Sequence, residues 1–293
     1  MRRLEGSFVA LATPFTEKGA FDREVYRALI EWHIASGTDG IVPCGCTGEA
    51  ATLSHKEQMG IIDFCLEVVA GRVPVVAGTG SNSTAEAIEL TRHAAEAGAD
   101  AALLITPYYN KPTPEGQFRH YRAIAEAADI PIVLYNVPSR TGTNMLPETV
   151  ARLAREVKGI VAIKEASGDI DQIATIASIS DITILSGNDS QTLPILALGG
   201  TGVISVTANV APAQVAEVCR LWRGGETAEA ARLHLKLMAL HKAVFIETNP
   251  LPVKTILAAM GRIKPVWRLP LCEMTAAGRE RLMAVATQYG LVK

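Results

Sequence analysis

The chain has 293 residues, of which 48% are hydrophobic and 20% charged, and its formal net charge is −2. It can bury a large core, and its length suits one large barrel or two ordinary domains. The small net charge gives no reason to expect nucleic acid or an anionic membrane surface as a partner, because both favour a basic patch. No apolar run approaches the roughly 18 residues of a membrane span, and the first residues lack the pattern of an export signal. We therefore expect a cytoplasmic protein.

The five cysteines are scattered along the chain, at positions 44, 46, 65, 219 and 272. None of them has the paired C-x-x-C spacing of a zinc site or a redox dithiol. Free thiols in a reducing compartment fit this pattern best, and we expect no metal.

Short apolar runs rich in β-branched residues recur along the first two-thirds of the chain, and stretches of helical period follow them. Strands are expected at residues 7–12, 39–44, 73–77, 101–106, 130–135, 161–164, 182–186 and 202–206. Eight strands that alternate with helices are typical of an α/β protein with a TIM (β/α)8 barrel, whose buried strands need no period-2 alternation.

Helix signals lie between these runs and dominate the end of the chain. Ser83 to Glu86 has the pattern of a capping box that opens a helix running to Ala97, with Gly98 as its stop. From Ala211 the pattern is almost wholly helical, with a break at residues 224–225. We expect a catalytic barrel over residues 1–224 and a C-terminal helical region over residues 225–293.

Lys164 is the most informative single residue, because it ends an apolar strand just before a glycine-bearing loop. A lysine at the end of a buried strand costs free energy unless it is paired or its pKa falls toward neutrality. A free amine is a nucleophile toward carbonyl groups. The alternative is a lysine that pairs with a carboxylate such as Glu165 or extends to solvent.

Polar side chains follow the other expected strands, where a barrel carries its catalytic residues. Tyr135 ends the strand before that of Lys164, and neighbouring parallel strands lie about 5 Å apart. A phenol beside an imine can move protons, although a buried tyrosine is more often an ordinary core residue. Arg140 has the fork geometry that suits a carboxylate, or it is a solvated surface arginine. The loop from Gly45 to Glu49 fits a ligand cradle or an ordinary turn.

Together these residues resemble the dihydrodipicolinate synthase/N-acetylneuraminate lyase family, barrels of the class I aldolase type that form a Schiff base with pyruvate. The resemblance covers essentially the whole chain. It is carried by residues 45–49 (GCTGE), 135–142 (YNVPSRTG), 163–166 (IKEA), 202–209 (GVISVTAN) and 247–254 (ETNPLPVK). Ser139-Arg140-Thr141-Gly142 indicates the synthase branch, because the lyases lack this arginine.

The resemblance implies a role for each matching position. Lys164 would form the imine with pyruvate, Tyr135 would donate and accept protons, and Arg140 would hold the carboxylate of L-aspartate 4-semialdehyde. Tyr109 would complete a hydroxyl relay in the site of a neighbouring subunit, so a dimer or a homotetramer is implied. Thr47, the main chain of Ile204 and Gly187 would bind pyruvate or line the same site. The product would be 4-hydroxy-tetrahydrodipicolinate, on the diaminopimelate route to lysine, with no metal or organic cofactor.

Cys46 departs from the family pattern, which has threonine or serine in the middle of the tyrosine relay. A thiol is a weak hydrogen-bond donor and acceptor, so it should carry a proton less well. We hypothesise that a water or a direct contact between Tyr109 and Tyr135 supports the relay, or that the relay matters less here. Turnover of a Cys46→Thr variant tests this.

The resemblance also implies an inhibitory site for L-lysine between two subunits. Weak to moderate inhibition is expected, because Gln58 replaces a histidine that is frequent there. His55 also fits a helix-start surface residue, and Glu86 a capping carboxylate. The matching positions are Ala50, Ala51, His55, Gln58, Asn82, Glu86 and Tyr108.

Two alternatives remain open. The first is another pyruvate-dependent aldolase or a sugar-acid dehydratase that uses Lys164 with a different second substrate, against which Arg140 argues. The second is a non-catalytic barrel that binds a metabolite, for which Cys46 is the only support. Trapping of a pyruvyl adduct on Lys164 with borohydride discriminates catalysis from binding alone.

Overall fold

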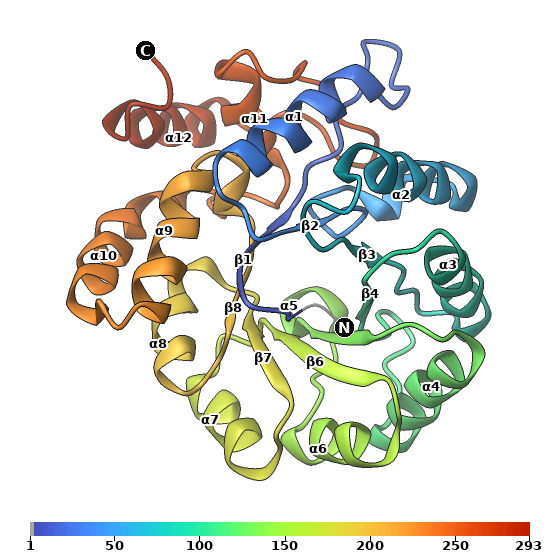
Figure 1. Ribbon diagram of the computed structural model, residues 1–293. Helices are drawn as coiled ribbons and strands as arrows, with labels where there is room; N and C mark the ends of the chain where they lie inside the picture. The colour runs from blue at the N-terminus through green and yellow to red at the C-terminus, as the bar shows by residue number, and fades with distance from the viewer. Residues whose placement is uncertain (1–2) are drawn as a thin grey trace. The chain divides into compact units, whose positions relative to one another are not determined.

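A computed structural model, which describes residues 3–293, shows the TIM (β/α)8 barrel that the sequence predicts (Figure 1). Each of the eight predicted runs overlaps a strand. The strands are β1 (Gly6–Ala10), β2 (Gly40–Val42), β3 (Val76–Gly78), β4 (Ala101–Ile105), β5 (Ile132–Asn136), β6 (Ile160–Glu165), β7 (Thr183–Ser186) and β8 (Gly202–Ser205). Their order in the sheet is β2-β1-β8-β7-β6-β5-β4-β3. The registers described between neighbours are parallel, as expected of strands joined by helices.

The helices follow the strands in the predicted alternation and continue after β8. They are α1 (Arg23–Ala35), α2 (His55–Val69), α3 (Thr84–Glu96), α4 (Pro114–Ala127), α5 (Pro138–Thr141), α6 (Pro147–Glu156), α7 (Ile170–Ile179), α8 (Thr192–Ala197), α9 (Pro212–Arg223), α10 (Thr227–Ala243), α11 (Leu251–Ala259) and α12 (Ala276–Gln288). Short 3-10 turns cover Ala50–Thr52, Asp189–Gln191 and Thr207–Asn209.

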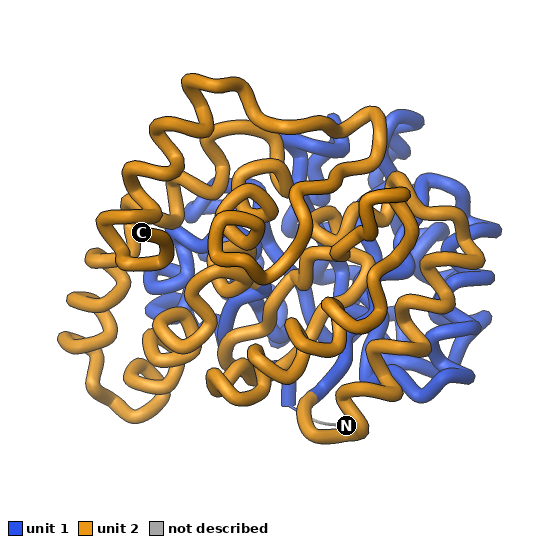
Figure 2. Tube along the Cα trace, turned by 90° about the horizontal axis from the view of Figure 1, so that it is seen from above, with its two compact units in different colours: residues 1–5, 74–204 blue, residues 6–73, 205–293 orange. Residues whose placement is uncertain are grey.

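The chain divides into two compact units (Figure 2). Unit 1 contains the chain up to Glu5 and Pro74–Ile204, and unit 2 contains Gly6–Val73 and Ser205–Lys293. The barrel of residues 1–224 with a helical region at 225–293 stays a prediction. Within 225–293 the structure has the helices α10, α11 and α12 and no strand.

The core of unit 1 lies between its strands and the helices outside them, as Figure 1 shows for α4, α6 and α7. Leu104, Leu134 and Ile163 on the strands belong to the same buried cluster as Phe118 and Ile124 of α4. Burial of large apolar side chains, at roughly 1.5–3 kcal/mol each, is the main source of stability for such a layer.

The strands differ from the prediction at their ends, and two differences matter for the site. Cys44 has a φ of 55°, a left-handed conformation that cannot continue a strand, so β2 ends earlier than expected. In contrast, β5 and β6 each include one residue beyond the predicted Tyr135 and Lys164. These residues are Asn136 and Glu165.

The capping box predicted at Ser83 does not form, although the helix begins where expected. Ser83 Oγ accepts the Glu86 N–H, as in half of a capping box. The other half is missing because Ser81 intervenes: its Oγ accepts the Ser83 N–H at 3.1 Å and donates to the Glu86 carboxylate at 2.7 Å. A complete capping box forms at Ser54 and Glu57, at the start of α2.

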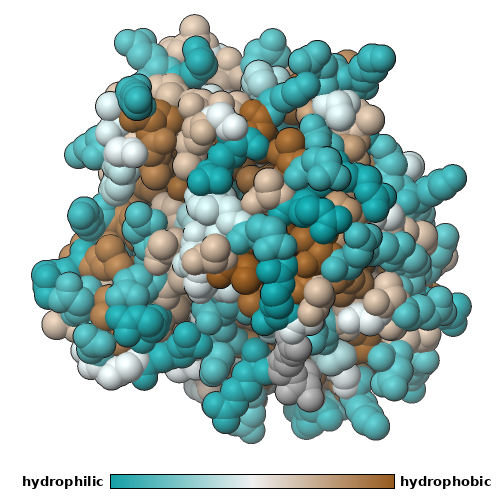
Figure 3. Space-filling model, turned by 45° about the horizontal axis from the view of Figure 1, so that its top comes forward, coloured by the Kyte–Doolittle hydropathy of each residue, from teal (hydrophilic) through white to brown (hydrophobic). Residues whose placement is uncertain are grey.

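Hydrophilic and hydrophobic residues are interspersed on the face that Figure 3 shows. Within the described part of the chain, no helix is both long and apolar enough to span a membrane. The large hydrophobic side chains at the surface include Tyr109, which is 89% exposed, and Tyr108 beside it, which is 37% exposed.

Candidate active site

Lys164 and Tyr135 lie side by side at the carboxyl ends of β6 and β5. The two strands are paired in parallel, and Tyr135 is the register partner of Lys164. Both side chains are buried, with 5% and 6% of their surface exposed. The Lys164 Nζ lies over the tyrosine ring, 4.2 Å from its centroid. The prediction that the amine and the phenol come together from neighbouring strands is therefore confirmed.

The expected alternative, a pair between Lys164 and Glu165, does not fit the strand. Consecutive residues of a strand point to opposite faces, so the Glu165 carboxylate lies away from the Lys164 amine. Glu165 is fully buried, and its carboxylate accepts hydrogen bonds from Asn136 Nδ2 at 3.1 and 3.2 Å, from the Ser167 N–H at 2.6 Å and from Gln172 Nε2 at 3.3 Å. Burial raises the pKa of Glu165, and the hydrogen bonds from Asn136, Ser167 and Gln172 oppose that rise.

Arg140 is exposed on the short helix α5, in the loop that follows β5. Asn136 precedes this loop and also holds its far end, because its Oδ1 accepts a hydrogen bond from the Met145 N–H at 3.0 Å. Inside it, the Thr141 hydroxyl donates to the Val137 and Thr143 carbonyls at 3.2 and 2.8 Å. The guanidinium therefore projects from a loop of fixed backbone.

Gly187 follows β7 directly and cannot carry a side chain. A Cβ there would lie 2.6 Å from the Cβ of Ala166 and 3.0 Å from the Glu165 carbonyl oxygen, closer than atoms pack. Its N–H donates to that carbonyl at 2.7 Å. Ile204 is fully buried on β8. Tyr109, in contrast, has a φ of 68° and projects from the surface after β4.

Unit 2 contains the loop from Gly45 to Glu49. Thr47 is 2% exposed, and its hydroxyl accepts a hydrogen bond from Asn249 Nδ2 at 3.0 Å. The Thr13 hydroxyl donates to the Gly48 carbonyl at 2.7 Å. Cys46 is a partly buried free thiol. No local pattern predicts the contact between Thr47 and Asn249, since the two residues are 202 positions apart.

Glu49 forms a buried ion pair with Lys254, and both side chains are 0% exposed. Glu49 has a left-handed φ of 56°, which turns its side chain inward from the loop. The Lys254 Nζ also lies 4.5 Å from the centre of the Phe15 ring. Burial lowers the pKa of Lys254, and the charge and hydrogen bond of Glu49 oppose that change. Lys254 belongs to a motif that carries the resemblance, but the residues alone assign it no role.

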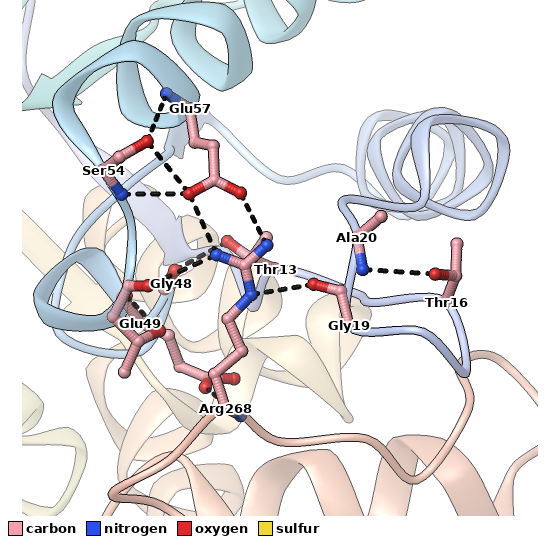
Figure 4. Close-up of polar contacts among 10 residues, drawn as sticks. Thr13, Thr16, Gly19, Ala20, Gly48, Glu49, Ser54, Glu57 and Arg268 are labelled. Carbon is pink, nitrogen blue, oxygen red and sulfur yellow. Dashed lines mark hydrogen bonds and ion pairs between the residues drawn. The ribbon is translucent and has the colours of Figure 1, made fainter.

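Arg268 extends this cluster, as Figure 4 shows. Its N–H donates to Glu49 at 3.4 Å, and its guanidinium donates to both carboxylate oxygens of Glu57, at 2.7 and 3.1 Å. It also donates to the Gly19 carbonyl at 2.8 Å. Sequence reasoning missed this arginine, because nothing around position 268 has a recognisable motif.

The residues expected at a lysine site lie in both units. Ala50 and Ala51 open the 3-10 turn before α2, which carries His55 and Gln58. In unit 1 the Asn110 side chain donates to the Asn82 carbonyl at 2.9 Å, which joins the turn after β4 to the start of α3. Glu86 and Tyr108 belong to the same two segments. The inhibitory role of all these positions stays a prediction.

Among residues 3–293 the structure has no group of three or more His, Cys, Asp or Glu side chains that could hold a metal ion. That the reaction needs no cofactor stays a prediction.

The structure is thus a (β/α)8-barrel protein with a buried lysine against a tyrosine at the ends of two paired strands, and comparisons with known proteins identify the family. Residues 3–289 match the model of the dihydrodipicolinate synthetase family, and the chain belongs to this family. The 4-hydroxy-tetrahydrodipicolinate synthase of Thermodesulfovibrio yellowstonii is 55% identical over 291 residues, which are 99% of each chain.

Two solved structures extend the comparison. The chloride-inhibited dihydrodipicolinate synthase of Acinetobacter baumannii, in complex with pyruvate, is 44% identical with a TM-score of 0.96, over 99% of this chain and 100% of that one. The enzyme of Cyanidioschyzon merolae with lysine bound is 40% identical with a TM-score of 0.95, over the same shares. The family that the sequence resembles is therefore confirmed.

Proposed function

We propose that this protein is a lyase that condenses pyruvate with L-aspartate 4-semialdehyde to give 4-hydroxy-tetrahydrodipicolinate, a step in diaminopimelate and lysine biosynthesis. The relatives support this activity, because they bear the name of that synthase at about half identity over the whole chain. The observation that carries the chemistry is the contact between the Lys164 amine and the Tyr135 ring on paired strands.

The reaction follows from a buried amine. Lys164 Nζ attacks the ketone carbon of pyruvate, and loss of water gives an iminium that acts as an electron sink. Loss of a C3 proton gives an enamine, which attacks the aldehyde carbon of the semialdehyde and leaves a hydroxyl there. The amine of that substrate then attacks the imine carbon, closes the ring and releases Lys164.

The other residues act in this sequence through roles that the family resemblance supports. Tyr135 carries protons to and from the carbinolamine, and Arg140 holds the semialdehyde carboxylate. Thr47, the main chain of Ile204 and Gly187 bind pyruvate or line its site. Tyr109 and Cys46 complete the proton relay, the tyrosine in the site of a second subunit of a homotetramer. The exposure of Tyr109 in the single chain supports that last assignment.

Borohydride trapping tests the proposal. Reduction in the presence of pyruvate is expected to leave a pyruvyl adduct on Lys164, identified by peptide mass spectrometry. A Lys164→Ala variant should give no adduct, whereas Lys158→Ala, a change at a surface lysine before the same strand, should react like the parent. An unmodified Lys164 in the parent protein would overturn the proposal.

A different second substrate is the main alternative, and Arg140 discriminates it. An Arg140→Ala variant should raise KM for aspartate semialdehyde and leave pyruvate trapping intact, because the arginine contacts only the second substrate. Faster turnover of sugar aldehydes than of aspartate semialdehyde by the parent protein would favour another aldolase or dehydratase of the family.

L-lysine is proposed as an inhibitor, with cytoplasmic biosynthesis as the context. The relative with lysine bound supports the ligand, and the family resemblance assigns His55, Asn82 and Glu86 to its site. Weak to moderate inhibition is expected at millimolar lysine. Unchanged activity at that concentration would reject it.

A further inference from the structure

The residues that follow Tyr135 and Lys164 lie on the other face of the sheet, and they contact each other. Asn136 follows Tyr135, Glu165 follows Lys164, and both pairs are in register on β5 and β6. We propose that Asn136 and Glu165 are positioning residues that hold the two strand ends together, and so fix the distance between the Tyr135 ring and the Lys164 amine. The proposal rests on the proposed function, because it concerns the geometry of the same reaction.

The contact lies at the last residue of each strand, where a parallel ladder would otherwise end. Asn136 Nδ2 donates to both oxygens of the Glu165 carboxylate, at 3.1 and 3.2 Å. Both residues are fully buried. The main chain continues the ladder on either side, with the Ala166 N–H donating to the Asn136 carbonyl at 2.9 Å and the Gly187 N–H to the Glu165 carbonyl at 2.7 Å. The ends of β5 and β6 are thus tied by side chains as well as by backbone, and the ends of β6 and β7 by backbone.

The same asparagine ties the Arg140 loop to these strand ends. Besides accepting the Met145 N–H, Asn136 donates to Asn144 Oδ1 at 2.7 Å. Asn144 in turn donates to Gln172 Oε1 at 2.6 Å and accepts from Gln172 Nε2 at 3.3 Å. Gln172 also donates to Glu165, so the four side chains form a closed ring of hydrogen bonds. One network, buried at Asn136 and Glu165 and partly exposed at Asn144 and Gln172, therefore supports the amine, the phenol and the loop that carries the guanidinium.

The carboxylate is required because every partner that Glu165 meets in this network is a donor. Asn136 Nδ2, the Ser167 N–H and Gln172 Nε2 all donate to it. An amide in place of the carboxylate would direct an N–H at one of these donors. Two N–H donors that face each other repel, so the side chains of the ring must move apart. A displacement of about 1 Å at a reacting group can lower a rate about 100-fold.

The experiment compares Glu165→Gln with a matched control, Thr91→Val. The control removes a buried hydroxyl from the 2.9 Å contact between Thr79 and Thr91 in the same unit, away from β5 and β6. We expect Glu165→Gln to lower kcat and the rate of borohydride trapping by about 10- to 100-fold, with KM for pyruvate within about 3-fold of the parent. The control should keep its kcat, although both variants lose a buried hydrogen bond.

A reciprocal variant separates positioning from a purely structural role. The double variant Glu165→Gln/Gln172→Glu exchanges the carboxylate and the amide. The amide at position 165 can then donate to the carboxylate at position 172. We expect this double variant to recover part of the lost kcat. If Glu165→Gln does not fold, Gln172→Ala removes one donor from the partly exposed end of the ring and should lower kcat by a smaller factor.

The outcomes distinguish failure of the proposed function from failure of the positioning role of Asn136 and Glu165. A parent protein that traps no pyruvate overturns the proposed function and, with it, this inference. A parent that traps pyruvate, with a Glu165→Gln variant that folds and keeps the parental kcat, overturns the positioning role alone. A kcat that falls equally in Glu165→Gln and Thr91→Val does the same, because the loss would then reflect general destabilisation.

Discussion

Glu165 in unit 1 and Glu49 in unit 2 are both buried carboxylates beside residues of the proposed site, but they are held in different ways. The Glu165 carboxylate is surrounded by neutral donors from Asn136, Ser167 and Gln172. Glu49 is paired with the ammonium of Lys254. Neutral donors can be lost one at a time, whereas a buried ion pair leaves an unpaired charge when one partner is removed.

The two kinds of partner, neutral donors and an ammonium, also differ in which segments of the chain they join. Each hydrogen bond between side chains of the unit 1 network joins residues at most 29 positions apart, and the network ties strand ends and one loop. The unit 2 cluster joins the loop from Gly45 to Glu49 to residues more than 200 positions later. Closing a loop between such distant segments costs more chain entropy than closing a short one, although this cost grows slowly with length. Charge-assisted hydrogen bonds are stronger than neutral ones and offset it better.

Removal of the Lys254 ammonium should give the largest loss of stability. Lys254→Met leaves the Glu49 carboxylate buried without its partner, and we expect the free energy of unfolding to fall by about 3–5 kcal/mol. Urea unfolding measures this. The double variant with Glu49→Gln removes both charges and should recover most of the loss.

The matched control is Lys264→Met, which breaks an exposed ion pair with Glu17 whose side chains are 48% and 80% exposed. It should change the free energy of unfolding by about 1 kcal/mol or less. A Lys254→Met protein as stable as this control would show that Glu49 tolerates the loss of its partner, and the contrast between the two networks would fail.

Removal of the Asn136 side chain should give an intermediate loss. Asn136→Ala deprives Glu165, Asn144 and the Met145 N–H of one partner each, and we expect a loss of about 2–3 kcal/mol in the free energy of unfolding. Because Ser167 and Gln172 still donate to Glu165, the loss should stay below that of Lys254→Met. Urea unfolding of both variants under the same conditions compares them. The reverse order would contradict the distinction between neutral and ionic partners.

The pH dependence of stability should give the smallest and most specific effect, with opposite signs in the two units. The hydrogen bond from Arg268 lowers the pKa of Glu57 to about 2, so its contribution is present above its ordinary value of 4.5 and is lost as the pH falls through about 2. Burial raises the pKa of Glu165 above its ordinary value of 4.5. The contribution of Glu165 is therefore full below 4.5 and is lost as the pH rises through its folded pKa.

Thermal unfolding of Glu57→Gln and Glu165→Gln between about pH 3 and pH 7 measures the two signs. As the pH rises, the deficit of Glu57→Gln relative to the parent should grow to about 1 kcal/mol or less, because the carboxylate is partly exposed. The deficit of Glu165→Gln should shrink over the same range. Parallel slopes for the two variants would rule out the opposite pKa shifts.

Two sequence patterns of the same kind show where prediction succeeded and where it stopped. Ser83-x-x-Glu86 and Ser54-x-x-Glu57 both match a capping box, and each serine does cap a helix. Only Ser54 forms the reciprocal bonds, because Ser81 takes the place of one partner at Ser83. A pattern determines which bonds a segment can make, and neighbouring donors decide which of them form.

The amino-acid pattern was sufficient to predict the alternation of strands and helices, the barrel class and the neighbourhood of Tyr135 and Lys164. These depend on local hydrophobic pattern and on chain order, since consecutive strands of a (β/α)8 barrel are adjacent. The contact between Asn136 and Glu165 is visible only in the folded chain, because it depends on where β5 and β6 end and on their register. The tertiary structure also decided the partners of Glu49 and Thr47, which come from segments more than 200 residues away. No local pattern records such contacts, because packing of the whole chain selects them.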